Sequence, residues 1–238
     1  MTDAKTPPKD SKATRSRPPN RKAEKTVAKR EARRSPERTR ERILKAAISE
    51  FSGKGPGGAR VDTIARRSGA NKRMIYHYFG SKEGLFLAAL ERTYGEIREA
   101  EAELHLEEFD PMVAMRKLVE FNFAYYIDHP HFIPLLNAEN VYRARHLRKS
   151  DRIQQAQSPI ISMIRGILRR GQKAGVFRKR VDPLQLYITI AALGYFYFAN
   201  MHTLSTAFGQ ELGEQAEIDK RRRHAVEVVL GYLSLEGD

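Results

Sequence analysis

The chain contains no cysteine at any of its 238 positions, which excludes disulfide bonds, thiolate nucleophiles and metal sites built on sulfur. It also lacks an N-terminal apolar segment of the kind found in signal peptides. Its most apolar run, Leu186 to Ala199, is too short to span a bilayer, because a membrane helix needs about 20 such residues. These absences predict a cytoplasmic protein with no membrane partner, and nothing in the sequence calls for a cofactor.

Acidic residues are scarce relative to basic ones. The chain has 43 Lys and Arg against 29 Asp and Glu, a formal net charge of +14. Residues 1–40 alone carry +9 of that charge. An excess of this size favours a polyanionic partner, with nucleic acid ahead of an anionic membrane surface.

Large apolar side chains are almost missing from residues 1–34, where Val27 is the only one after Met1. The segment has four prolines and many charges, so it cannot bury enough apolar surface to offset its chain entropy. We expect residues 1–34 to form a disordered basic tail. It could serve for solubility alone or as an arm that binds DNA without sequence preference.

The rest of the chain has helical signals and no alternating run flanked by turn residues, so it is expected to be all-α. Ser35-Pro36 is a suitable helix start, and "GKGPGG" at 53–58 is a stop. The expected helices cover 36–52, 61–68, 71–78, 81–104 with Ser81 as its cap, about 113–128, 131–146, 152–173, 183–208 and a last one with Ala225, Val228, Val229, Tyr232 and Leu235 on one stripe. We predict a helix-turn-helix domain over 35–84 and a helical bundle over 85–238.

The three short helices have the lengths and turn spacing of a helix-turn-helix DNA-binding unit. The third must enter a major groove about 12 Å wide, so its outward face must carry hydrogen-bond donors and its inward face must pack. Met74, Ile75 and Tyr78 or Phe79 suit the inward face. The expected DNA contacts are Asn71, Lys72, Arg73 and His77 on the outward face, with Tyr76 and Lys82 at phosphates.

The stretch "VDTIARRSGANKRMIYHYFGSKEGLF", with "ILKAAISEFSGKG" before it, resembles the N-terminal domain of the TetR family of bacterial transcriptional regulators. The resemblance covers residues 36–90. It implies that Tyr76, His77 and Lys82 hold phosphates, and that Asn71, Lys72 and Arg73 face bases or nearby backbone. One departure is Arg60, which stands where the family has Ser or Thr. Arg60 can reach a phosphate but cannot cap the helix, which leaves Thr63 or Asp62 as possible caps.

The resemblance further implies a C-terminal domain that binds a small-molecule effector and forms a homodimer. Residues 184–208 are apolar nearly all round, more than one core face needs, and the last helix has a long apolar stripe. The last two helices could pair with their copies in a four-helix interface, although a fully buried helix in a monomer would look similar. We therefore expect a repressor that binds an inverted-repeat operator in double-stranded DNA and is released by its effector.

Polar residues interrupt the segment 129–147, "HPHFIPLLNAENVYRARHL", in a way unusual for a core helix. It resembles a subgroup of TetR-like regulators that govern degradation of heterocyclic or aromatic acids. A capped, salt-bridged surface helix is the plainer alternative. The expected effector-binding residues are Asn137, Asn140 and Arg143, on neighbouring turns, with Tyr126, Tyr195 and Asn200 as further candidates.

An enzyme is the main competing class of protein. None of the seven histidines forms a helical ligand pair with a carboxylate, so a metal site is not expected. No glycine-rich phosphate loop and no nucleophile elbow is present. A nucleic-acid-binding protein without an effector, or a helical enzyme, remains as the alternative to a ligand-responsive regulator.

Overall fold

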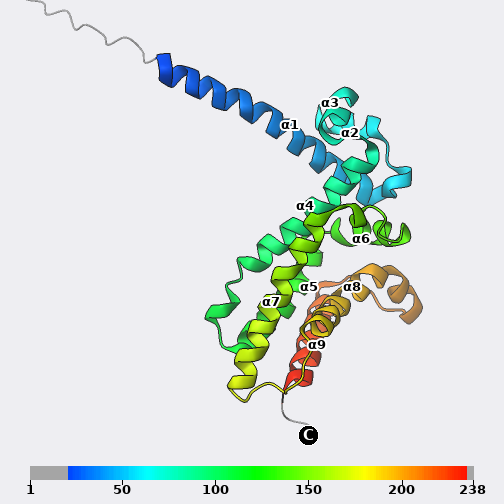
Figure 1. Cartoon of the computed structure of the whole chain (residues 1–238). Coiled ribbons are helices and arrows are strands. Elements are labelled where there is room, and N and C mark those ends of the chain that lie inside the picture. Colours follow the sequence, from blue (N-terminus) through cyan, green and yellow to red (C-terminus); the bar gives the residue numbers. More distant parts are fainter. Residues whose placement is uncertain (1–20, 235–238) are drawn as a thin grey trace, which may run out of the picture. The chain divides into compact units, whose positions relative to one another are not determined.

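The computed structural model describes residues 21–234, which form helices joined by short turns and, over that range, no strand (Figure 1). It divides the chain into two units, Met1–Arg38 and Thr39–Asp238. The first unit is described from Arg21 onward, as helical backbone only. The all-α prediction is confirmed for the described residues.

The first helix starts earlier than expected. Helix α1 runs from Arg21 to Gly58, so residues 21–34 differ from the disordered tail that the sequence suggested, while residues 1–20 lie outside the described part. Residues 21–34 contain no proline and consist largely of Ala, Arg, Lys and Glu, which are strong helix formers. Gly55 has a left-handed φ of 63° and breaks the helix within the expected stop.

Three further helices complete the N-terminal region: α2 from Val61 to Ser68, α3 from Lys72 to Phe79 and α4 from Lys82 to Ala102. Phe51 and Phe86 meet edge-to-face at 5.0 Å in the core of this region, and both are fully buried. The core takes in Leu90 of α4 and Leu135, so it extends beyond residue 84.

The C-terminal bundle contains α5 (Pro111–Asp128), α6 (Phe132–Val141), α7 (Asp151–Lys173), α8 (Pro183–Phe208) and α9 (Gln215–Leu233), with short 3₁₀ turns at Leu106–Glu108 and Leu147–Lys149. Helix α5 packs against α7, α8 and α9 around a shared apolar core. Pro183 begins α8 as expected, and Asp182 caps it by accepting from the Leu184 and Gln185 N–H groups. None of the described helices is both long and apolar enough to cross a membrane.

Helix α6 is shorter than the 131–146 expected from sequence, because the chain leaves the helix after Val141. Arg143 and Ala144 adopt left-handed conformations, with φ of 54° and 57°. The buried Glu139 side chain stabilises this turn: it accepts hydrogen bonds from the His146 N–H at 2.8 Å and the Leu147 N–H at 3.0 Å, and it pairs with His146 Nδ1 at 2.6 Å. Two strained residues are thereby held in place.

Candidate DNA-binding surface and ligand cavities

Helix α3 presents a polar face to solvent and an apolar face to the core. Ile75 is fully buried, and Met74 and Tyr78 pack beside it against the N-terminal core. The outward-facing side chains are all exposed: Asn71, Lys72, Arg73, Tyr76 and His77. The structure thus brings the predicted base- and phosphate-contacting residues onto one surface.

Two of these residues already have partners within the protein. Asn71 caps α3, because its Oδ1 accepts a hydrogen bond from the Met74 N–H at 2.8 Å. Lys72 Nζ lies 2.6 Å from Asp62 Oδ1, and this hydrogen bond raises the pKa of Lys72. The Asn71 cap orders the start of α3, and the Lys72–Asp62 pair joins α3 to α2. Arg73 is the long cationic side chain on this face that has no partner among the described residues.

The start of α2 has no side-chain cap. Arg60 occupies the N-cap position without a capping hydrogen bond, as expected from its chemistry, and neither Asp62 nor Thr63 replaces it. The exposed Arg60 guanidinium and the half-buried Thr63 lie at this helix start. Instead of a cap, the Arg60 N–H donates to the side chain of Glu50 at 3.4 Å.

Glu50 is a buried carboxylate that the sequence did not single out. It also pairs with Lys54 at 3.1 Å and Arg67 at 3.2 Å, so it joins α1 to α2. Burial raises the pKa of Glu50, but the hydrogen bonds from Lys54 and Arg60 and the charge of Arg67 outweigh burial and lower it overall. The only sequence signal that could have indicated the buried Glu50 carboxylate is its position as a charged residue within the otherwise apolar stripe of α1.

The start of α4 forms a second polar edge near α3. Ser81 caps α4 by accepting from the Gly84 N–H at 3.0 Å, as predicted. Lys82, the first residue of α4, donates to the Gly57 carbonyl oxygen at 3.3 Å, which fixes the position of its ammonium group. An ammonium and free amides together suit a phosphate.

A cavity of about 410 Å³, partly open to solvent, lies among α4, α5, α6, α7 and α8. Its size is within the range of small-molecule sites. No charged side chain lines it, and four tyrosines contribute to its wall. The lining residues are Tyr94, Ile97, Asn122, Tyr126, Phe132, Leu136, Ile161, Leu184, Tyr187, Ile188, Ala191, Ala192 and Tyr195.

The cavity offers both hydrogen-bond donors and an acceptor. Burial raises the pKa of Tyr94 to about 12 and also raises that of Tyr126, so both hydroxyl groups keep their protons at neutral pH and can donate. Asn122 is buried, and its Oδ1 has no hydrogen-bond partner among the described residues. A buried oxygen without a partner favours a ligand that brings a donor.

A buried ion pair lies behind this wall. Arg98 donates to the Tyr187 hydroxyl at 3.1 Å and pairs with Glu101 at 2.7 Å. Burial raises the pKa of Glu101 to about 7, and Arg98 offsets only part of that rise.

The six residues expected to bind an effector separate into two groups. Tyr126 and Tyr195 line the cavity, and Asn137 accepts a hydrogen bond from the Tyr195 hydroxyl. Asn140 and Arg143 line neither this cavity nor the groove described next: Asn140 is exposed in the last turn of α6, and Arg143 is exposed after the helix has ended. Asn200 donates to the Phe196 carbonyl oxygen of its own helix. Sequence analysis missed Tyr94, Asn122 and Tyr187, which only the packing of α4, α5 and α8 brings together.

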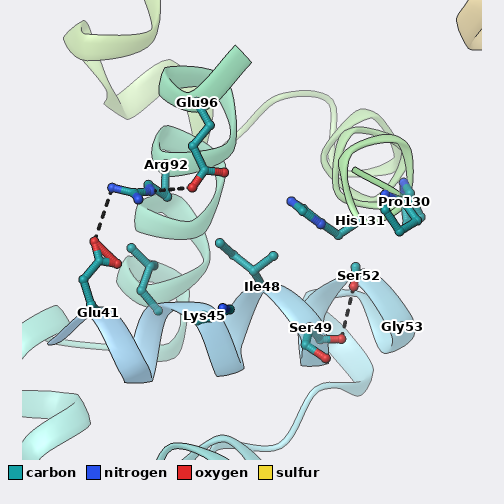
Figure 2. A pocket seen from close by; sticks show the side chains of 12 residues that line it. Glu41, Lys45, Ile48, Ser49, Ser52, Gly53, Arg92, Glu96, Pro130 and His131 are labelled. Atoms are coloured by element: carbon teal, nitrogen blue, oxygen red, sulfur yellow. Dashed lines mark hydrogen bonds and ion pairs between the residues drawn. The ribbon is translucent and has the colours of Figure 1, made fainter. Parts of the chain in front are cut away.

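A larger groove, of about 770 Å³, lies between α1, the middle of α4 and the segment 130–134 (Figure 2). Arg92 forms ion pairs with Glu41 at 3.2 Å and with Glu96 at 2.7 Å. Figure 2 shows Arg92 between these two carboxylates. The half-buried His131 also faces this groove, and burial lowers its pKa. Unlike the cavity, the groove has charged walls whose arginine and glutamates already pair with one another.

Comparisons with known proteins agree with this geometry. Residues 43–89 match the model of the tetR family of bacterial regulatory proteins, and residues 111–229 match the tetracyclin repressor-like C-terminal domain. Over 184 residues the chain is 42% identical to the HTH-type transcriptional repressor NicS of Pseudomonas putida, covering 77% of this chain and 87% of that protein. The chain belongs to the TetR family. It is therefore a DNA-binding transcriptional regulator and not an enzyme.

Other TetR-type regulators are more distant. The HTH-type transcriptional repressor SCO4008 of Streptomyces coelicolor is 29% identical over 163 residues, 68% of this chain and 79% of that protein. The ketosteroid transcriptional regulator KstR2 of Mycobacterium tuberculosis has the same fold, with a TM-score of 0.61 at 20% identity, covering 83% of this chain and 95% of that chain. The N-terminal TetR match spans α2, α3 and the Glu50 cluster, whereas the C-terminal match spans most of the cavity.

Proposed function

We propose that this TetR-family regulator is a repressor that binds an inverted-repeat operator as a homodimer and leaves it when a small ring-containing effector enters the cavity of α4–α8. The observation that carries the proposal is the span of α4. One end of α4 holds Ser81 and Lys82 at the DNA-binding surface, and its later turns place Tyr94 and Ile97 in the cavity wall. A regulator of this kind works where the chromosome is, in the cytoplasm.

The expected DNA contacts divide into base readers and phosphate binders. Arg73 is assigned to a base edge because its guanidinium is exposed and unpaired, and a bidentate arginine favours guanine. Arg60, Thr63, Tyr76, His77 and Lys82 are assigned to phosphates or to the backbone near them. Lys72 can reach DNA only by sharing or leaving Asp62, so we assign it a smaller part.

The expected effector follows from the cavity wall. Tyrosine rings suit a planar ring, the Asn122 oxygen suits a donor on that ring, and the Tyr94 and Tyr126 hydroxyls suit an acceptor. No charged side chain lines the cavity, so the nearest charge that a strongly charged effector could use is Arg98, which lies behind Tyr187.

Two helices can carry the signal from cavity to DNA. Helix α4 is 21 residues long, so it spans about 30 Å and moves as a rod. Helix α6 has Phe132 and Leu136 in the cavity wall and Leu135 in the N-terminal core. A ligand that shifts either helix would change the separation of the two recognition helices in the dimer. Operator half-sites have a fixed spacing, so a small mismatch weakens binding.

The dimer is expected to form through α8 and α9. Several large apolar side chains on these helices are exposed, among them Phe196 at 56% and Tyr232 at 49%. Such a face favours a partner surface of the same kind.

Footprinting on the DNA upstream of the regulator's own gene tests the proposal. We expect a protected inverted repeat. Arg73→Ala should weaken the free energy of operator binding by about 1–3 kcal/mol and reduce the base specificity at one base pair per half-site. Lys82→Ala should weaken all sequences about equally and reduce the salt slope by about one unit. The absence of a protected palindrome would contradict the proposal.

A thermal-shift screen of small ring compounds tests the effector assignment, because a ligand at one hundred times its Kd adds about 2.7 kcal/mol of stability. Asn122→Leu should still bind operator and lose the response to the compound found. Asn140→Ala, an exposed position outside the cavity, is the matched control. An undiminished affinity in Asn122→Leu would place the effector elsewhere.

A further inference from the structure

The turn between α6 and α7, residues 142–149, has the sequence "YRARHLRK" and is strongly basic. Its four cationic side chains, Arg143, Arg145, Arg148 and Lys149, are all exposed. None of the four forms an ion pair with a residue that the structure describes. The turn lines neither the ligand cavity nor the charged groove. Its charge is therefore available to an anionic partner.

The backbone of this turn has a defined and strained shape. Arg143 and Ala144 have left-handed φ angles of 54° and 57°, a conformation that costs free energy in residues other than glycine. The buried Glu139 side chain offsets that cost by accepting hydrogen bonds from the N–H groups of His146 and Leu147. The Glu139 carbonyl oxygen accepts from the Ala144 N–H at 3.1 Å. Side chains on such a backbone lose less conformational freedom on binding than those of a mobile loop.

The turn lies along the first half of α4. The His146 ring meets the Phe86 ring edge-to-face at 5.0 Å, and Leu147 packs against the N-terminal core. The Ser150 hydroxyl, directly after the turn, donates to Glu91 at 2.5 Å. Followed backwards from Ser150, the chain thus runs along α4 from its third turn toward its start.

The first residue of the turn reaches the loop that holds Lys82. The Tyr142 hydroxyl oxygen lies 3.1 Å from the position that a Cβ on Gly57 would occupy. The carbonyl oxygen of the same glycine accepts the hydrogen bond from Lys82, which is assigned to a phosphate. The Arg145 guanidinium lies over the Tyr142 ring, 5.2 Å from its centroid. This end of the turn, with Arg143 and Arg145, therefore lies beside the start of α4.

Electrostatics at the start of α4 agrees with this position. The pKa of Glu83 is lowered chiefly by hydrogen bonds from its own backbone N–H and from the Ser81 hydroxyl, which outweigh burial. The positive charges of Lys82 and Arg145 lower the pKa of Glu83 further. Because Lys82 and Arg145 act on the same carboxylate, they contribute to one region of positive potential.

The opposite end of the turn lies farther from this region. Glu91, which bonds to Ser150, lies about 13 Å along α4 from Lys82, since a helix rises about 1.5 Å per residue. Charges at physiological ionic strength are screened over about 8 Å. The cations at that end are therefore largely screened from a phosphate bound at Lys82, and Arg143 and Arg145 are the two that lie near enough to act.

We propose that Arg143 and Arg145 form a further phosphate-binding patch, contributed by the α6–α7 turn and not by the helix-turn-helix region. The inference rests on the proposed operator binding and extends it: the two guanidinium groups contact the DNA backbone next to the phosphate held by Lys82. Phosphate contacts strengthen binding and fix orientation without reading bases. The patch therefore lengthens the DNA contact of each subunit and leaves base readout to α3.

Operator titrations over a range of salt concentrations test the patch. The Arg143→Gln/Arg145→Gln variant removes two charges and keeps two long polar side chains. The matched control is Lys179→Gln/Arg180→Gln on the α7–α8 connection, where both residues are exposed and Arg180 has a left-handed φ of 61°, as Arg143 has one of 54°. Circular dichroism confirms folding, and Arg145→Gln alone is the second variant should the left-handed position not accept glutamine.

We expect a loss confined to the α6–α7 turn. Each phosphate contact contributes about 0.9 to the slope of log affinity against log salt. The Arg143→Gln/Arg145→Gln variant should therefore lose up to about two units of slope per half-site and bind operator at least about fivefold more weakly at about 0.15 M salt. Its preference for operator over unrelated DNA should stay nearly constant, because both have the same phosphates. Ethylation interference should lose signal at phosphates next to those affected by Lys82→Ala.

An unchanged slope and an unchanged interference pattern in the folded Arg143→Gln/Arg145→Gln variant would overturn the patch and leave operator binding intact. An equal loss in the Lys179→Gln/Arg180→Gln control would show an effect of net charge alone and would overturn the patch as well. A native chain that protects no inverted repeat would instead contradict the proposed function itself.

Discussion

Glu50 in the DNA-binding region and Glu101 near the ligand cavity are both buried glutamates, yet their surroundings differ. Glu50 has Lys54, Arg67 and the Arg60 N–H around it, and its pKa is lowered. Glu101 has Arg98 alone, neither of its oxygens makes a hydrogen bond among the described residues, and its pKa is raised.

The same contrast extends to the regions around them. The N-terminal region packs Phe51, Ile64 and Phe86 as fully buried side chains of one core. The C-terminal region has a cavity, with buried polar atoms of Asn122, Tyr125 and Arg98 that lack hydrogen bonds. A well-packed core holds one shape, whereas a hollow region with unpaired polar groups can change shape when a ligand fills it. The first suits DNA recognition, and the second suits a sensor.

The largest expected effect on stability is in the well-packed N-terminal region. Phe51→Ala should lower the free energy of unfolding by about 3–5 kcal/mol, because it leaves a cavity beside Phe86. Leu136→Ala, which only enlarges the existing ligand cavity at a half-buried position, should cost about 1–2 kcal/mol. Urea denaturation measures both. Equal costs would remove the distinction between a packed region and a hollow one.

The Glu50 cluster gives the next largest effect. Glu50→Gln should cost about 1–3 kcal/mol at pH 7, because Lys54 and Arg67 lose their shared anion. The folded-state pKa of Glu50 is lowered, so its contribution to the free energy of unfolding is present above the ordinary carboxyl pKa. That contribution is lost as the pH falls through the folded-state pKa of Glu50. Urea denaturation at pH 7 and pH 3 should therefore show a smaller difference between native and variant chains at the lower pH.

Glu101 should have the opposite pH dependence, with a smaller effect. Its folded-state pKa is raised to about 7, so its stabilising contribution is complete below the ordinary carboxyl pKa and is lost as pH rises toward 7. At pH 5 the Glu101→Gln variant should have a lower free energy of unfolding than the native chain. At pH 8 this difference should be smaller, or the variant should be the more stable of the two. The same pH profile in both chains would show that Glu101 does not titrate in this range.

The smallest expected effect on stability is that of the tail. Deleting residues 1–34 should change the free energy of unfolding by no more than about 0.5 kcal/mol, because the segment has almost no large apolar side chains. If the tail acts as an arm, non-specific DNA affinity and its salt dependence should fall more than the preference for operator. An unchanged salt slope in a binding titration would leave the tail without a role on DNA.

Much of the DNA-binding region could be predicted from the sequence, because its signals are local. The Ser81 cap and the exposed face of α3 depend on neighbours within a few residues, and so does the Pro183 start of α8 in the C-terminal bundle. The cavity could not be predicted in the same way. Tyr94 and Asn122 meet only because α4 and α5 pack across it, and their spacing in the sequence carries no sign of that. The end of α6 was missed because Glu139 stabilises two left-handed residues from outside the turn.

Filling the cavity by mutation tests most directly whether its occupancy controls DNA binding. Ala191 lines the cavity at a half-buried position, and Ala191→Phe places a ring inside it without any effector. Ala174→Phe, at an exposed helix end, is the matched control. Fluorescence anisotropy with labelled operator should show Ala191→Phe binding at least about tenfold more weakly than the native chain, a difference of about 1.4 kcal/mol, and Ala174→Phe binding normally. A folded Ala191→Phe variant that binds operator as tightly as the native chain would contradict control of DNA binding by this cavity.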